Sequence, residues 1–268
     1  MSVPAWLRKR LPILVTLFLL AAWAALVEPA WVEVTHHAVR STTPGEKIRL
    51  VQLSDLHLRS IGRTEAGVLD AVASLTPDLI LLTGDIVDRP GNLALLDTFL
   101  SRLPPVRKFA VLGNWEYWGD IDLKTLRETY ARHGVMLLIN QCEHLNLRGR
   151  NLNVVGLDDA TAGRPETDKL RPCTDAAGDT VLIQHSPGYF ANASPVGNQP
   201  ELNLAGHTHG GQLSLFGWAP WTPIGSGPFN RGWYQTGWGR LYVSRGIGTS
   251  ILPLRFASRP EVAAFDLE

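Results

Sequence analysis

The sequence predicts an α/β fold preceded by an N-terminal membrane helix, and three observations support this prediction. Short runs of apolar, partly β-branched residues recur along the chain, and such runs are typical of buried strands. In the first half of the chain they alternate with segments of helical apolar spacing, at residues 64–75, 92–103 and 122–133. Residues 11–27 contain no charged residue and approach the length that spans a bilayer.

Five of the strand-like runs end at carboxylate, amide or imidazole side chains. The runs occupy residues 48–53, 79–82, 109–112, 180–183 and 202–205. The polar residues that follow them are Asp55, His57, Asp85, Asn114, His185, His207 and His209. Ligands of open α/β sheets bind beyond the carboxyl ends of the strands. Because five such ends carry only oxygen and imidazole groups, we interpret them as one site. Shorter strand signals follow at residues 136–139, 144–147, 152–155, 241–244 and 262–265.

Taken together, these motifs resemble a known family. In chain order they read Asp-x-His, Gly-Asp-x-x-Asp, Gly-Asn, an isolated His and Gly-His-x-His. This set resembles the calcineurin-like metallophosphoesterases, and residues 242–261 favour a bacterial, membrane-anchored phosphodiesterase branch of that family. The resemblance covers residues 47–268 and implies a four-layer α/β/β/α sandwich with two packed sheets.

The resemblance also implies a role for each motif residue. Asp85 would bridge two divalent metal ions, and Asp85, Asn114 and His207 would form the catalytic centre. The remaining ligands would be Asp55, His57 and His209 for the first ion, and Asn114, His185 and His207 for the second. Oxygen and imidazole ligands without a thiolate favour Mn²⁺, Fe²⁺ or Zn²⁺. A hydroxide shared by the two ions would attack the phosphorus of a phosphodiester or diphosphate.

Two residues beside the motifs need a separate interpretation. Asp88 is predicted to orient a histidine or a water, and the alternative is a solvated acid at a helix start. Most family members carry a proton-donating histidine where this chain has Trp115, whose indole cannot supply a proton near neutral pH. We therefore expect an enzyme that prefers good leaving groups. Glu116 or His133 could take over the role, and the further alternative is an impaired enzyme that acts as a metal- and lipid-binding protein.

Composition limits the partners. The chain has 25 basic and 25 acidic residues, so its charge balance gives no support for nucleic-acid binding. Cys142 and Cys173 match no zinc spacing, and we predict two free buried thiols, with pairing in an oxidising compartment as the alternative.

The first thirty residues are predicted to be a cytoplasmic stub and a transmembrane anchor. Arg8, Lys9 and Arg10 precede the apolar run, and no further Lys or Arg occurs before Arg40. The positive-inside rule then places residues 47–268 on the periplasmic side of the inner membrane, behind a linker at 31–46. The alternative is a signal peptide cleaved near residues 22–24, which would export the domain.

An aromatic cluster bears on the substrate. It lies between residues 216 and 239 and comprises Trp218, Trp221, Phe229, Trp233 and Trp238. Such rings near an anchor sit at the headgroup level of a membrane, which favours a lipid-linked phosphate ester as substrate. The alternative is that the rings fill the domain core. Asp158, Asp159 and Arg164 are predicted to form a surface turn, with a place at the substrate rim as the alternative.

Overall fold

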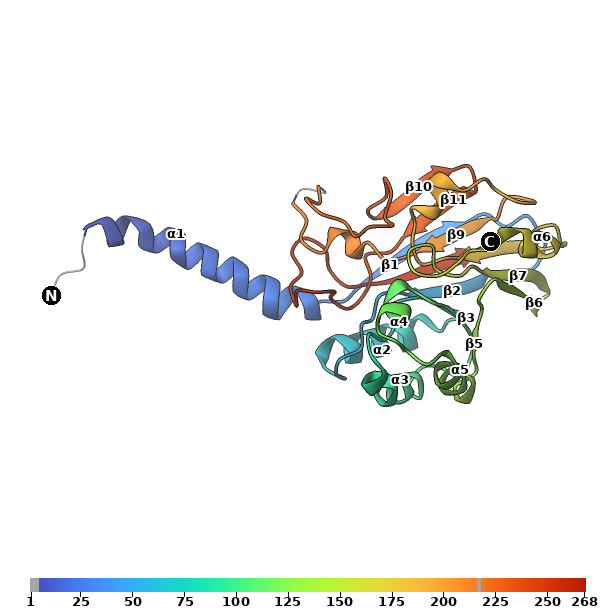
Figure 1. The fold of residues 1–268 in the computed structure, drawn as a ribbon, viewed down its shortest axis with the longest axis horizontal. Helices are drawn as coiled ribbons and strands as arrows, with labels where there is room; N and C mark the ends of the chain where they lie inside the picture. The colour runs from blue at the N-terminus through green and yellow to red at the C-terminus, as the bar shows by residue number, and fades with distance from the viewer. Residues whose placement is uncertain (1–4, 216–217) are drawn as a thin grey trace.

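The computed structural model describes residues 5–215 and 218–268, whose strands form two packed six-stranded sheets (Figure 1). The first sheet has the order β1-β12-β2-β3-β4-β5. Its strands are β1 (Glu33–Val39), β2 (Ile48–Leu53), β3 (Leu79–Thr83), β4 (Arg107–Val111), β5 (Val135–Leu137) and β12 (Glu261–Leu267). Strands β2 to β5 are parallel, and β12 is inserted between β1 and β2, parallel to the former and antiparallel to the latter.

The second sheet has the order β10-β11-β9-β8-β7-β6. Its strands are β6 (Gln141–Leu147), β7 (Arg150–Gly156), β8 (Asp179–Ile183), β9 (Leu202–Ala205), β10 (Gly232–Thr236) and β11 (Gly239–Val243). The four inner strands are parallel, and the two edge strands β6 and β10 are antiparallel to their neighbours. Their parallel arrangement brings the carboxyl ends of β8 and β9 to the same edge of the sheet.

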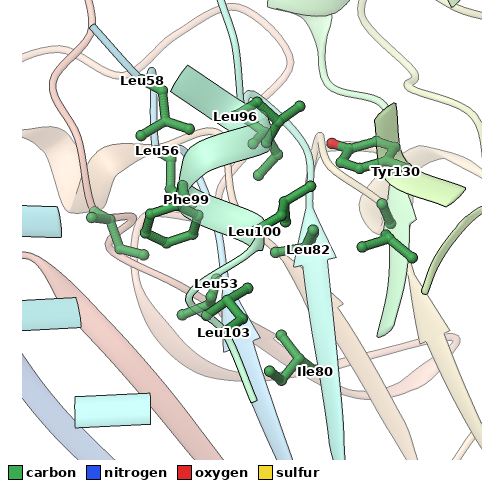
Figure 2. Close-up of a cluster of buried hydrophobic side chains, with 14 of the residues drawn as sticks. Leu53, Leu56, Leu58, Ile80, Leu82, Leu96, Phe99, Leu100, Leu103 and Tyr130 are labelled. Carbon is green, nitrogen blue, oxygen red and sulfur yellow. The ribbon is translucent and has the colours of Figure 1, made fainter. Parts of the chain in front are cut away.

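Helices cover the outer face of the first sheet. They are α2 (Arg63–Leu75), α3 (Leu93–Leu100), α4 (Asn114–Trp118) and α5 (Leu123–Arg132), with the 3-10 turn η3 (Pro90–Asn92) before α3. Figure 2 shows how α3 buries Leu96, Phe99 and Leu100 against Ile80 and Leu82 of β3. Along β3, Ile80 and Leu82 alternate with Leu79 and Leu81, which face the opposite side of the sheet. Strand β3 is therefore apolar on both faces.

The other core layers lie between the sheets and on the outer face of the second sheet. The layer between the sheets contains Leu50, Leu81, Val154 and Ile183. Short helical elements contribute to the outer layer: η4 (Thr167–Leu170), α6 (Arg171–Thr174) and α7 (Tyr189–Asn192). The turn η5 (His209–Gly211) follows β9. The predicted α/β fold with two packed sheets is therefore confirmed, and its fourth layer consists of short helical turns.

The N-terminal helix projects from the domain (Figure 1). Helix α1 (Ala5–Ala22) continues into the π-helical turn η1 (Trp23–Val27) and the 3-10 turn η2 (Glu28–Ala30). The continuous stretch Arg10–Ala30, 21 residues from α1 through η2, is long and apolar enough to cross a membrane. A signal sequence would have the same length and composition. Part of the segment predicted as a linker forms strand β1, which pairs with β12 along its full length.

The structure differs from the sequence-based expectations at the two cysteines and at one edge strand. Cys142 of β6 and Cys173 of α6 form a disulfide bond, with Cα atoms 6.4 Å apart, so the prediction of free thiols was wrong. The two residues are separated by 31 positions, and only the folded chain brings them together. Strand β10 had no prediction, because it is half-buried and mixes glycine, aromatic and polar residues.

The aromatic cluster divides between core and surface. Phe229 and Trp238 are buried under the second sheet, and Trp233 is half-buried beside Arg240. Trp218 and Trp221 are exposed. The core interpretation therefore holds for some of these rings and fails for the two exposed ones.

Candidate metal centre

The predicted ligand residues meet where five strands end. Asp55 and His57 follow β2, Asp85 follows β3, and Asn114 begins α4 directly after β4. The second sheet contributes His185 after β8, and His207 and His209 after β9. The carboxyl ends of strands from both sheets therefore meet at one edge of the sandwich, and all seven side chains are buried.

The carboxylates and imidazoles form two adjoining groups. The first group contains Asp55, His57 and His209, and the second contains Asp85, His185 and His207. Within each group the possible ligand atoms lie within 4.8 Å of one another. In the first group, Nε2 of His57 is 3.1 Å from Nε2 of His209. In the second, Nε2 of His185 is 3.2 Å from Nδ1 of His207.

Asp85 touches both groups. Its Oδ2 atom lies 3.1 Å from Nε2 of His185 and 3.7 Å from Nε2 of His57. Its Oδ1 atom accepts a hydrogen bond from the backbone N–H of Trp115 at 2.8 Å. The backbone therefore fixes one oxygen of Asp85 and leaves the other between the two groups.

Hydrogen bonds on the far side of three imidazole rings set their orientation. Nδ1 of His57 contacts Oδ1 of Asp88 at 2.5 Å, as the sequence predicted for a carboxylate orienting a histidine. Nδ1 of His185 contacts the carbonyl of Thr83 at 2.7 Å, and Nε2 of His207 contacts the carbonyl of Ile224 at 2.7 Å. When a ring donates one N–H in this way, its other nitrogen presents a lone pair to the site, which suits a metal ligand.

Asn114 provides an independent test of the metal interpretation. Its Oδ1 atom is buried and accepts no hydrogen bond from any residue that the structure describes. Buried oxygens are almost always paired, so an unpaired one at a site of carboxylates and imidazoles fits a cation ligand. The donor set of oxygen and nitrogen atoms suits divalent transition metals.

The electrostatics of the site are strongly perturbed. Burial favours the neutral acid at Asp85, but the neighbouring His185 lowers the pKa of Asp85 below its usual range. Burial raises the pKa of Asp55. Burial and the proximity of His185 lower the pKa of His207 to about 4, so this ring is neutral at physiological pH. Such opposed shifts in one cluster are typical of a functional site.

The backbone conformation of the ligand residues is also typical of a functional site. Five ligand residues have left-handed backbone angles: φ is 53° at Asp55, 45° at His57, 53° at Asp85, 72° at His207 and 50° at His209. Such angles cost free energy in residues with a Cβ atom and cluster at functional sites.

Glu116 holds this strained backbone together. Its carboxylate accepts hydrogen bonds from the backbone N–H groups of Gly113 at 2.8 Å, Asp85 at 3.1 Å and Ile86 at 2.7 Å. Burial and the charge of Asp85 raise the pKa of Glu116 to about 7. A Cβ atom at Gly113 would overlap the Asp85 carboxylate, which explains the glycine there. Sequence reasoning noted Glu116 only as a proton donor and missed this role.

Trp115 lines the cavity of the metal centre. This cavity of about 150 Å³ is also bordered by Asp85, Asn114 and His207. The alternative proton donors do not line it: Glu116 faces backbone N–H groups, and Nε2 of His133 contacts Asp97 at 2.9 Å.

The prediction of a surface turn at Asp158 and Asp159 was wrong. Both side chains are buried, whereas Arg164 is exposed. Asp159 accepts a hydrogen bond from Ser186, the residue after His185, and Asp158 accepts one from Tyr117. These two carboxylates therefore support the loops that carry the ligands.

Arg255 had no sequence signal. It is fully buried, with Nη2 3.4 Å from Nδ1 of His209, and it donates hydrogen bonds to the carbonyls of Gly248, Arg245 and Ser258. Arg255 is held in the core by hydrogen bonds to the carbonyls of other residues, and no local sequence motif indicates these contacts.

The two-sheet α/β sandwich and its paired carboxylate–imidazole groups define a protein of the metal-binding phosphoesterase class. More specifically, the chain belongs to the calcineurin-like phosphoesterase family, whose model matches residues 48–211. This membership makes it a hydrolase of phosphate esters, in a family that normally binds divalent metals.

Relatives of the predicted branch match most of the chain. It is 30% identical over 259 residues to the uncharacterized metallophosphoesterase YkuE of Bacillus subtilis, covering 92% of this chain and 89% of that protein. It is 31% identical over 251 residues to the phosphodiesterase YaeI of Escherichia coli, covering 90% of each. Among solved structures, GAP50, the anchor in the inner membrane complex of Plasmodium, shares the fold with a TM-score of 0.50 and 11% identity, over 83% of this chain and 81% of that one.

Proposed function

We propose that this protein hydrolyses phosphodiesters or diphosphates with the help of two divalent metal ions. The oxygen and nitrogen ligands of the site suit Mn²⁺, Fe²⁺ or Zn²⁺. The observation that carries the proposal is the position of Asp85, whose Oδ2 atom lies within 3.7 Å of imidazoles from both ligand groups. In this proposal Asp85 is shared, Asp55, His57 and His209 hold the first ion, and Asn114, His185 and His207 hold the second.

Two bound ions would supply charge neutralisation at phosphorus and a shared hydroxide as nucleophile near neutral pH. The net reaction adds water across one P–O bond, so that a phosphodiester gives a phosphomonoester and an alcohol. The chain contributes by fixing ligand positions: the hydrogen bonds of Asp88, Thr83 and Ile224 leave each ring little freedom to rotate.

Trp115 shapes the choice of leaving group. It lines the cavity where the family histidine would stand, and its indole cannot donate a proton near neutral pH. The departing oxygen must then leave as a weakly basic anion. This favours diphosphates and aryl esters over simple alkyl esters. It also motivates the alternative function, an impaired enzyme that binds metal and lipid without turnover.

Hydrolysis of bis-p-nitrophenyl phosphate by the full chain with added Mn²⁺ tests the proposal. Asp85→Asn should lower kcat/KM by about 100-fold or more, because a two-metal site supplies several kcal/mol of transition-state stabilisation. Asp70→Asn, on the exposed surface of α2, is the matched control. Wild-type protein that binds Mn²⁺ but hydrolyses nothing would support the impaired-enzyme alternative.

We further propose that α1 anchors the domain on the periplasmic side of the inner membrane. The apolar stretch of 21 residues supports an anchor, and the disulfide bond of Cys142 and Cys173 supports an oxidising compartment. Sequencing the N-terminus of the membrane-bound protein decides between an anchor and a cleaved signal peptide: a chain beginning after residue 24 would refute the anchor.

A further inference from the structure

We propose that an apolar cavity beside the metal centre binds the hydrocarbon chain of a membrane lipid whose phosphate ester is the substrate. This inference rests on the proposed function, because it names the substrate class of the same site. It also places the mouth of that site at the surface of the bilayer that α1 enters.

Two adjoining cavities form the binding region. The cavity of the metal centre contains Asp85, Asn114 and His207. The second cavity, of about 230 Å³, is lined by Gly211, Leu213, Pro220 and Leu252 among others. Residues that border both are His209, Trp221, Pro223, Ser250 and Ile251. A phosphate held at the metal centre would therefore direct one of its substituents into the second cavity.

The second cavity suits a hydrocarbon. Among the described residues that line it there is no Asp, Glu, Lys or Arg. The side-chain amide of Gln212 donates to the backbone carbonyl of Leu252 at 2.8 Å and accepts from the N–H of Ser250 at 2.9 Å, so its polar atoms are satisfied within the protein. An apolar cavity of about 150 Å³ binds benzene, so one of this size accommodates a longer hydrocarbon segment.

The rim of this cavity exposes large apolar side chains. Ile251 is 68% exposed, Trp221 58% and Leu252 50%, and Ile224, which borders the adjoining cavity of the metal centre, is 89% exposed. Single exposed apolar residues are ordinary on soluble proteins, but a group of them around one opening marks an interaction site. Trp221, Ile251 and Leu252 line this cavity and are also exposed, so a partner that covers them also reaches the cavity.

The position of the rim indicates that a lipid bilayer covers it. Arg255, three residues after Leu252, donates its backbone N–H to the carbonyl of Ala24 at 2.9 Å. The N–H of Ser258 donates to the carboxylate of Glu28 at 2.6 Å. These bonds attach the rim loop to the end of the apolar helix, and Figure 1 shows α1 leaving the domain beside the orange and red loops. A bilayer that contains α1 would therefore meet this rim.

A pair of substrates with one leaving group tests the inference. The full chain in detergent micelles is assayed with Mn²⁺ on p-nitrophenyl phosphodiesters whose second substituent is methyl or dodecyl. Each methylene buried in the cavity should favour the long ester about fourfold. We expect Leu252→Glu to lower the dodecyl-to-methyl ratio of kcat/KM by at least about tenfold. Met136→Glu, a comparably exposed position on β5, should leave this ratio unchanged. A wild-type ratio near one, or equal ratios in wild type and Leu252→Glu, would overturn the chain site.

A second measurement needs neither metal nor turnover. Vesicles of dibromo-acyl phosphatidylcholine quench the fluorescence of tryptophans that reach the acyl region. We expect Trp221→Phe to lower the fraction of the full chain's tryptophan fluorescence that these vesicles quench. Trp233→Phe is the control, because Trp233 lies half-buried on β10. Equal quenching in the two variants would refute the membrane contact and favour a protein partner at the rim. If the wild-type protein hydrolyses neither ester but Trp221 is quenched by the vesicles, the proposed hydrolase function is refuted and the membrane contact is not.

Discussion

Replacing Asp88 with Asn should weaken metal binding while leaving the fold intact. Asp88 contacts Nδ1 of His57 at 2.5 Å and accepts a hydrogen bond from Arg59 at 3.1 Å. The first contact turns Nε2 of His57 toward His209 and makes the ring a stronger ligand. Asn retains the size of the side chain but loses the negative charge.

The expected loss of Mn²⁺ affinity is 10- to 100-fold, or about 1.4 to 2.7 kcal/mol, because this is the usual contribution of a carboxylate behind a ligating histidine. The pair with Arg59 adds little, since the Arg59 side chain is 40% exposed and its charge is screened by solvent. The effect should therefore come almost wholly from His57.

Affinity is measured by competition with a metal-sensitive dye, and the fold is checked by thermal unfolding followed by circular dichroism. Asp97→Asn is the matched control, because Asp97 contacts Nε2 of His133 at 2.9 Å in a similar carboxylate–imidazole pair away from the site. Wild-type affinity in Asp88→Asn, or an equal loss in Asp97→Asn, would refute the reasoning.

Three further predictions concern leaving groups, packing and pH. Trp115→His should raise hydrolysis of a methyl phosphodiester with an alkyl leaving group by about 10²-fold or more, since general-acid help contributes 10²–10⁴-fold; an unchanged rate would count against a missing proton donor. Leu82→Ala removes a fully buried side chain (Figure 2) and should lower the free energy of unfolding by about 2–5 kcal/mol in urea titrations, and a loss below about 1 kcal/mol would contradict the packing described. Hydrogen bonds from Arg49 and Lys47 lower the pKa of Asp266 from 3.8 to about 2, so its contribution is present above pH 3.8 and is lost as the pH falls through about 2. Asp266→Asn should therefore reduce the unfolding free energy by about 1 kcal/mol near neutral pH, after allowing for solvent screening, and the difference should vanish below about pH 2. A difference independent of pH would exclude the charge as its cause.

The residues of the candidate site can be selected from the sequence because each of them follows the end of a strand-like run. Asp55, His57 and Asp85 each follow an apolar run within a few residues, so a pattern read along the chain is enough to select them. That the two sheets pack face to face came from the family resemblance, since alternation of apolar residues in one strand says nothing about its partner sheet.

The features that sequence analysis missed depend on distant partners. Strand β1 is half-exposed and polar, and only its pairing with β12, more than two hundred residues later, makes it part of the sheet. The buried Asp159 resembled a solvated turn because its partner Ser186 lies in another loop. The disulfide bond has the same cause: nothing near Cys142 indicates Cys173.

The placement of β12 has a consequence for biosynthesis. This strand, Glu261–Leu267, lies between β1 and β2, although those two strands leave the ribosome more than two hundred residues earlier. Until it arrives, β1 has no partner in the first sheet, and β2 presents unpaired N–H and carbonyl groups along one side. A chain terminated before residue 261 would thus keep two open strand edges near its N-terminus, which makes a premature stop codon a source of aggregation rather than of a smaller working enzyme.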